Sequence, residues 1–348
     1  MSKLVVIDAD VLGRERTGDE SYVENLLREL AEAEAPLRLA AITRQPHRVP
    51  PGIEPLRLDA HSQSFRMAVR VPSLLRRMAP QVSHFHYVVP PRAPGRVVLT
   101  VHDLSFERRP ELMSRRDRAL FRSLVPRSVR RADRILVGSD WTRGDLVERY
   151  RIPEDKVVVT PYGVDPLFGR EGPARDGGPY LLFVGGLQPR KDPGTAVDAL
   201  TKLDPGLRLV FAGPPLRESR ELVEHVRKLR LSSRVEFTGY VRKPELAALY
   251  RGAACLVLPS LYEGFGLPLL EAMASGTPVV ATTAGALPEV AGDAAVLVEP
   301  GDPDELAAGV ERALADRERL VAAGLERSSR YSWAETARRT LAVYEELA

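Results

Sequence analysis

The chain of 348 residues is 44% hydrophobic and 28% charged, a composition typical of globular proteins and a length that favours two domains. It has no apolar run of about eighteen residues, which argues against a membrane span, and its only cysteine, Cys255, excludes an internal disulfide and is expected in the core. The net charge of +3 hides a basic segment, residues 65–134, with 16 Lys+Arg against 5 Asp+Glu.

The N-terminal half alternates short, β-branched apolar runs with segments of helical period. The first run stands directly before acidic residues in MSKLVVIDAD, which indicates a strand and not a secretory signal, so we expect a cytoplasmic protein. Continuously apolar runs are typical of strands buried on both faces, as in a parallel sheet wrapped by helices. The predicted strands of this half are residues 4–7, 37–42, 82–87, 96–101, 134–137 and 156–160.

A stretch dense in glycine and proline, residues 161–179, interrupts the alternation, and we place an interdomain linker at 166–179. The pattern then starts afresh, with predicted strands at 180–184, 207–213, 235–239, 255–260, 277–282 and 295–300. We therefore predict two α/β domains, residues 1–165 and 180–325, across a cleft, with a closing helix in 326–348. Ligands of such sheets bind beyond the carboxyl ends of the strands.

The most informative segment is PSLYEGFGLPLLEAMASGTPVV, residues 259–280. A buried strand ends before it, Gly264 and Gly266 allow close approach to a ligand, and a helix is expected to start near Pro268. A helix start favours anions, whereas Glu263 and Glu271 would repel them. Both features fit a ligand that carries hydroxyl groups beside phosphates, because carboxylates accept hydrogen bonds from diols. The alternative for a single glutamate is an acidic first turn.

A second cluster is VGGLQPRKDP, residues 184–193. Two glycines leave a strand, and Arg190 and Lys191 precede a helix that is expected to start near Pro193. Adjacent cations at a helix entrance suit a diphosphate leaving group, although a solvated basic turn is the alternative. The segment is not the G-x-G-x-x-G of a dinucleotide fold, which argues against a dehydrogenase.

These segments resemble a known family. EGFGLPLLE matches the E-x₇-E motif of the retaining glycosyltransferases of family 4, whose GT-B fold has two facing Rossmann-like domains, and the Arg-Lys segment is similar to a glycine-led motif of that family. The resemblance covers nearly the full chain. It implies that Glu271 binds the donor ribose, that Glu263 lies by the transferred sugar, and that Arg190 and Lys191 contact the diphosphate. It also implies donor contacts from the backbone amides of Gly264, Phe265, Gly266 and Leu267.

The N-terminal half carries fainter signals. His102 follows a strand in TVHDLSF, where a lone histidine is usually structural, but the resemblance implies a contact with the donor sugar near the reaction centre. In the loop at residues 11–22, the resemblance implies that Gly18 approaches the diphosphate, with Arg14 and Arg16 as weaker candidates.

Another predicted strand ends in His84, His86 and Tyr87. These side chains would either line an acceptor pocket or pack in the core. Because no carboxylate or cysteine stands among them, they do not indicate a metal site.

Together the residues and the resemblance predict an enzyme that moves a hexose from a nucleoside-diphosphate sugar to a glycan or lipid-linked acceptor, with retention of configuration. GDP-mannose is our hypothesis for the donor, with UDP- and ADP-sugars open. Since the two cations would serve the diphosphate, we expect no metal and no other cofactor. One alternative is a non-catalytic nucleotide-sugar-binding or scaffold protein. Another is a phosphorylase-type enzyme of the same fold class, but the sequence has no motif for the pyridoxal lysine that such an enzyme needs.

The basic segment, residues 65–134, has two interpretations. It would meet an anionic membrane or phosphorylated acceptor, which makes peripheral contact with the inner membrane face an open prediction, or it would form solvated Arg-rich helix faces. Nucleic acid is not expected as a partner, because no helix-turn-helix, zinc or RNA-binding motif accompanies the charge.

Overall fold

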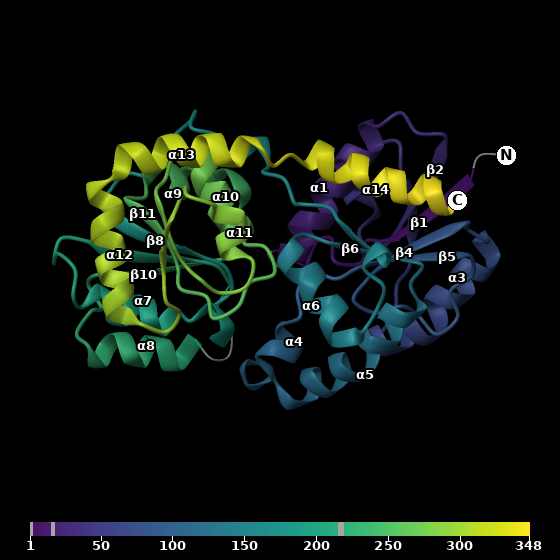
Figure 1. Cartoon of the computed structure of the whole chain (residues 1–348), viewed down its shortest axis with the longest axis horizontal. Helices are drawn as coiled ribbons and strands as arrows, with labels where there is room; N and C mark the ends of the chain where they lie inside the picture. The colour runs from purple at the N-terminus through teal and green to yellow at the C-terminus, as the bar shows by residue number, and fades with distance from the viewer. Residues whose placement is uncertain (1–2, 15–17, 215–218) are drawn as a thin grey trace. The chain divides into compact units, whose positions relative to one another are not determined.

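The computed structural model describes residues 3–14, 18–214 and 219–348. The chain divides into two compact units, the first made of Met1–Gly163 and Trp333–Ala348 and the second of Val164–Ser332. In the described residues, each unit is built on a parallel β-sheet with helices packed around it (Figure 1). The predicted class, two Rossmann-like α/β domains, is confirmed.

In its described part, the first unit holds a seven-stranded sheet in the order β3-β2-β1-β4-β5-β6-β7. Ile7 of β1 pairs with Ala41 of β2 on one side and with His84 of β4 on the other, so the strand order changes direction at β1. The carboxyl ends of these parallel strands meet at one edge. The strands are β1 Lys3–Asp8, β2 Leu37–Thr43, β3 Glu54–Arg57, β4 Val82–His86, β5 Arg96–Thr100, β6 Arg134–Val137 and β7 Val157–Val159.

The helices of the first unit include one from the far end of the chain. Helix α14, Trp333–Leu347, packs beside α1, Gly18–Glu32 (Figure 1). The predicted closing segment, residues 326–348, is therefore not one helix, because it joins the end of α13 in the second unit to α14 in the first. The other α-helices are α2 Gln63–Phe65, α3 Val71–Met78, α4 Ser105–Arg108, α5 Arg115–Arg131 and α6 Asp140–Tyr150.

Two further details differ from the sequence-based expectation. Strand β3 was not predicted, because its residues are largely exposed and form no apolar run; its Pro55 suits the edge of a sheet, where one missing N–H is tolerated. Residues 166–179, expected as a linker, belong to the second unit, where the N–H of Arg175 donates to the carbonyl of Ala248 at 2.9 Å.

The second unit, in its described part, holds a six-stranded sheet in the order β10-β9-β8-β11-β12-β13. Cys255 on β11 is fully buried in the core of this unit, as predicted, and burial raises the pKa of its thiol to about 12. The strands are β8 Tyr180–Val184, β9 Arg208–Ala212, β10 Val235–Gly239, β11 Cys255–Leu258, β12 Val279–Thr282 and β13 Val296–Val298. The helices are α7 Pro193–Leu200, α8 Ser219–Lys228, α9 Lys243–Gly252, α10 Leu267–Ala274, α11 Leu287–Ala291, α12 Pro303–Ala315 and α13 Arg317–Ser329.

Among the helices of the described residues, none has the length and apolar composition that crossing a lipid bilayer requires.

Candidate functional site

In the second unit, the loop after β11 places Glu263 against both predicted cations. Oε1 of Glu263 accepts hydrogen bonds from Lys191 Nζ and, at 2.7 Å, from Ser260 Oγ, while Oε2 accepts one from Arg190 at 3.3 Å. Glu263 and Lys191 are buried. The backbones are joined as well, because the N–H of Leu261 donates to the Arg190 carbonyl at 2.8 Å. The structure thus unites two motifs that lie about 70 residues apart in the sequence.

The charges of this ion cluster, defined as Glu263, Lys191 and Arg190, fix the protonation of the carboxyl group. Burial alone would raise the pKa of Glu263, but the positive charges of Lys191 and Arg190 and the hydrogen bonds from Lys191 and Ser260 lower it to about 2. Glu263 is therefore a carboxylate at physiological pH and has no proton to donate. Two cations against one carboxylate give these three side chains a formal charge of +1.

The backbone of Glu263 is held by a glycine that the sequence did not single out. Gly285 has a φ of +64°, and a Cβ at this position would lie 2.2 Å from the carbonyl oxygen of Glu263. The N–H of the next residue, Ala286, donates to that same carbonyl at 2.9 Å. Only glycine fits here, since any side chain would displace the loop that carries Glu263.

Glu271, the second glutamate of the motif, is half-buried on α10. Its Oε2 accepts a hydrogen bond from the hydroxyl of Tyr250 on α9 at 2.8 Å. Burial raises the pKa of Glu271 to about 7, against the opposing effects of the Tyr250 hydrogen bond and of Lys243. The two glutamates therefore differ in charge near neutral pH: one is fully ionised and the other is close to its midpoint. Tyr250 was not anticipated from the sequence.

The glycine-rich loop leads directly into the N-terminus of α10, one residue earlier than the predicted start at Pro268. Gly266 is the N-cap with a φ of +98° and has no side chain that could cap the helix. Such a helix start favours an anion. Phe265 is buried and packs edge-on against Tyr331 with ring centres 5.9 Å apart, so only its backbone is a candidate ligand contact. Gly264 and Leu267 are buried as well.

In the first unit, His102 lies just beyond the carboxyl end of β5. Its ring is buried, stacks on His86 with ring centres 5.5 Å apart, and meets Tyr22 edge-on at 4.9 Å. Nδ1 lies 2.7 Å from the hydroxyl of Tyr162. Burial lowers the pKa of His102, although Asp19 opposes the shift, so the imidazole is neutral at physiological pH.

The histidines at the end of β4 have different surroundings. His84 is fully buried, and its ring nitrogens contact the hydroxyl of Tyr344 on α14 at 2.6 Å and Thr100 Oγ1 at 2.7 Å. The packing interpretation therefore holds for His84. His86 is half-buried and lies, like Tyr87, against the ring of His102.

The predicted diphosphate loop of the first unit is described only in part. Gly18 is the first residue of α1, and no heavy atom lies within 4 Å of the position that a Cβ would take there. The next residue, Asp19, has Oδ1 4.0 Å from His102 Nε2. Gly18 and His102, both predicted to contact the donor, therefore lie near each other. Arg14 forms an ion pair with Asp10. Arg16 lies outside the described residues.

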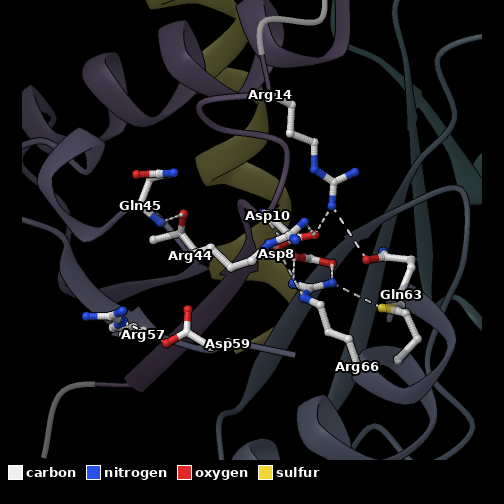
Figure 2. A network of polar contacts seen from close by, with 11 residues as sticks. Asp8, Asp10, Arg14, Arg44, Gln45, Arg57, Asp59, Gln63 and Arg66 are labelled. Atoms are coloured by element: carbon white, nitrogen blue, oxygen red, sulfur yellow. Dashed lines mark hydrogen bonds and ion pairs between the residues drawn. The ribbon is translucent and has the colours of Figure 1, made fainter. Parts of the chain in front are cut away.

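Figure 2 shows a cluster of carboxylates and arginines at the end of β1 that the sequence did not reveal. Asp8 accepts two hydrogen bonds from Arg66, one of them at 3.1 Å, and Arg66 is almost fully buried. Asp10 accepts bonds from Arg44 at 2.8 and 3.0 Å and also from Arg14. Arg66 is thus a core residue, and neither interpretation of the basic segment, a membrane-facing surface or a solvated face, applies to it. Its ion pairs tie the first helical turns after β3 to the end of β1.

Nowhere in the described part of the chain do three or more His, Cys, Asp or Glu side chains form a group that could hold a metal ion.

Comparison with known proteins identifies the family to which this chain belongs. A family model described as "Glycosyl transferases group 1" matches residues 168–337, and one described as "Glycosyltransferase Family 4" matches residues 16–167. The chain is 32% identical over 269 residues to O-antigen chain mannosyltransferase B of Escherichia coli. The match covers 72% of this chain and 70% of that protein.

A second relative is the MMP alpha-(1->4)-mannosyltransferase of Mycolicibacterium hassiacum, 37% identical over 238 residues. The match covers 65% of this chain and 57% of the relative, so this chain spans less than two thirds of that protein. Among solved structures, sucrose-phosphate synthase from Thermosynechococcus elongatus superimposes with a TM-score of 0.83 and 22% identity over 99% of both chains.

Two parallel-sheet units, with a carboxylate-bearing cationic loop beyond the strands of the second, define a glycosyltransferase with the GT-B fold. The chain belongs to glycosyltransferase family 4, as the E-x₇-E motif indicated.

Proposed function

We propose that this enzyme transfers a hexose from a nucleoside-diphosphate sugar to a hydroxyl group of a glycan or lipid-linked acceptor, with retention at the anomeric carbon. The observation that carries the proposal is the ion cluster of Glu263, Lys191 and Arg190 together with Glu271 on α10. It combines two cations with two carboxylate acceptors. A ligand with phosphates beside hydroxyl groups satisfies both.

In the proposed complex, Arg190 and Lys191 stabilise the negative charge that grows on the diphosphate as the glycosidic bond breaks. The ionised Glu263 accepts a hydrogen bond from the transferred sugar, and Glu271 accepts bonds from the ribose. Because the pKa of Glu263 is about 2, it is unsuited to receive the acceptor's proton. The leaving phosphate takes that proton instead, which places attack and departure on the same face of the sugar, as retention requires. No metal enters this scheme.

Mannose as the transferred sugar is supported by the two sequence relatives described above, which are named mannosyltransferases. We therefore propose GDP-mannose as the donor. Thermal-shift measurements with GDP-mannose, UDP-glucose and ADP-glucose would test this part separately, and stabilisation by another sugar nucleotide in preference to GDP-mannose would replace it.

The test of the site separates the two glutamates by what each one binds. Glu271→Gln should weaken binding of GDP about ten- to a hundredfold at pH 8, because a hydrogen bond to a charged group contributes about 1.5–3 kcal/mol and GDP contains the ribose. Glu263→Gln should leave GDP binding unchanged or tighten it, because it removes the negative charge from beside Lys191 and Arg190. Turnover at saturating donor should fall instead, since the sugar exchanges a charged carboxylate acceptor for a neutral amide oxygen.

Calorimetry with GDP measures the nucleotide affinity of each variant, and turnover with GDP-mannose measures its catalysis. Glu318→Gln, an exposed glutamate on α13, is the matched control and should change neither quantity. Equal losses of GDP affinity in the Glu263 and Glu271 variants would contradict the division of roles. Slow hydrolysis of the donor without acceptor is expected of the wild type, and its absence would favour a nucleotide-sugar-binding scaffold.

The basic segment supports a peripheral contact with an anionic membrane on the cytoplasmic face, which we propose as the source of a lipid-linked acceptor. Six of its arginines are exposed on α5: Arg115, Arg116, Arg122, Arg127, Arg130 and Arg131. Large apolar side chains are exposed in the same segment, with Leu120 at 49%, Val69 at 48% and Phe65 at 46% of their surface. Exposed cations interleaved with apolar side chains suit the interfacial region of a bilayer.

A further inference from the structure

The buried ring of His102 has one nitrogen engaged and one without a partner. Nδ1 lies 2.7 Å from the hydroxyl oxygen of Tyr162. Nε2 is buried and has no hydrogen-bond partner among the described residues, and the carboxylate of Asp19 is 4.0 Å away. Buried polar atoms are nearly always paired, so Nε2 calls for a partner that the described residues do not supply, such as a ligand atom or a water molecule. Whether Nε2 can donate to that partner depends on which nitrogen carries the proton.

The hydroxyl group of Tyr162 is placed to determine which ring nitrogen of His102 carries the proton. Burial raises the pKa of Tyr162 well above its ordinary value, so the phenol keeps its proton and can donate it in a hydrogen bond. The ring is neutral because burial also lowers the pKa of His102. When the phenol donates to Nδ1 of a neutral imidazole, the imidazole proton must be on Nε2.

The hydroxyl of Tyr162 is held in position by its surroundings. The ring stacks on Trp333 of α14 with centres 5.9 Å apart and planes 12° apart, and it meets Tyr22 at 4.9 Å. On a third side it covers the backbone of Gly138, where a Cβ would lie 2.9 Å from Cζ of Tyr162. A larger residue at 138 would therefore push the phenol away from His102.

We propose that Tyr162 is a positioning residue that holds His102 in the Nε2–H tautomer, so that the unpartnered edge of the ring presents a single N–H donor to an oxygen of the transferred sugar. The inference rests on the proposed function for the identity of the ligand and on the geometry of the first unit for the tautomer. A sugar that presents only a hydrogen-bond donor at this point would be excluded, because Nε2–H cannot accept.

The tautomer is measured directly by long-range ¹H–¹⁵N correlation spectra of protein labelled in its six histidines, with His102→Gln identifying the signal. We expect the wild type, without ligand, to show protonated Nε2 and accepting Nδ1 at His102. Tyr162→Phe should give a mixture of tautomers. It should lower kcat about three- to tenfold, the loss of one hydrogen bond, and leave GDP affinity unchanged.

A second pair of variants separates positioning from folding. Gly138→Ala should shift the tautomer and lower kcat as Tyr162→Phe does, because it displaces the phenol. Gly144→Ala on α6 is the matched control: no heavy atom lies within 4 Å of its Cβ position, and it should behave as the wild type. Protonated Nδ1 in the wild type, or an unchanged spectrum in Tyr162→Phe, would overturn the proposal. Failure of the proposed function would appear differently, as absent turnover with an intact Nε2–H signal.

Discussion

Replacing Glu271 with Gln should stabilise the nucleotide-free protein above neutral pH. Burial beside α9 raises the pKa of Glu271 from an ordinary value of 4.5 to about 7. Between these values the folded protein holds a proton that the unfolded chain has released, so stability falls as the pH rises through this window and then stays constant. Glutamine carries no charge that burial would penalise, and its amide oxygen still accepts the hydrogen bond from Tyr250.

The size of the effect follows from the shift. At about 1.4 kcal/mol per pH unit, a rise from 4.5 to about 7 corresponds to about 3 kcal/mol at pH 8. For a unit the size of residues 164–332, each kcal/mol moves the melting temperature by about 2–4 °C. We therefore expect Glu271→Gln to raise the melting temperature of this unit by about 6–12 °C at pH 8 and to leave it almost unchanged near pH 4.5.

Differential scanning calorimetry of both proteins at pH 4.5 and pH 8, without nucleotide, measures this difference, with Glu318→Gln as the exposed control. The reasoning fails if the variant melts at or below the wild-type temperature at pH 8, or if the gain is the same at both pH values. Either result would mean that ionisation of the Glu271 carboxyl group does not lower the stability of the folded protein.

Three further outcomes are expected. Activity should survive EDTA, because Arg190 and Lys191 balance the diphosphate; loss on chelation that Mg²⁺ or Mn²⁺ restores would contradict the proposed phosphate site. The protein should co-sediment with anionic liposomes at low ionic strength and be released as salt rises, and no binding at low salt would leave the arginines of α5 as a solvated face. Gly285→Ala should lower turnover more than tenfold and destabilise the second unit by about 2 kcal/mol or more, since its Cβ would overlap the Glu263 carbonyl; wild-type activity would show that the loop can shift without consequence.

The sequence predicted those parts of the fold that local pattern determines. A continuous apolar run such as residues 180–184 has few interpretations other than a buried strand, and β8 is Tyr180–Val184. Strand β3 could not be found this way, because an exposed edge strand has no apolar run. The partner of α14 was hidden for a different reason: an amphipathic helix specifies that one face is buried but not against what.

The same distinction between local pattern and tertiary structure applies to the site. The loops around Arg190 and Glu263 were predictable, since neighbours in the sequence form each of them. The partners of their side chains come from elsewhere: Tyr250 reaches Glu271 from another helix, and Tyr162 is 60 residues beyond His102. Hydrogen bonds between distant side chains depend on the tertiary fold, and so do the pKa shifts of the buried groups.

The return of α14 to the first unit sets the order in which the protein can be completed during synthesis. The helix that supplies Trp333 to the ring of Tyr162, and the hydroxyl of Tyr344 to His84, leaves the ribosome only after the whole of Val164–Ser332 has been made. The second unit, which is continuous in the chain, can fold while translation proceeds, whereas the first unit is completed only after residues 333–348 have been made, and until then His84 lacks its contact with Tyr344. In this enzyme, the unit that is made first is the one that finishes folding last.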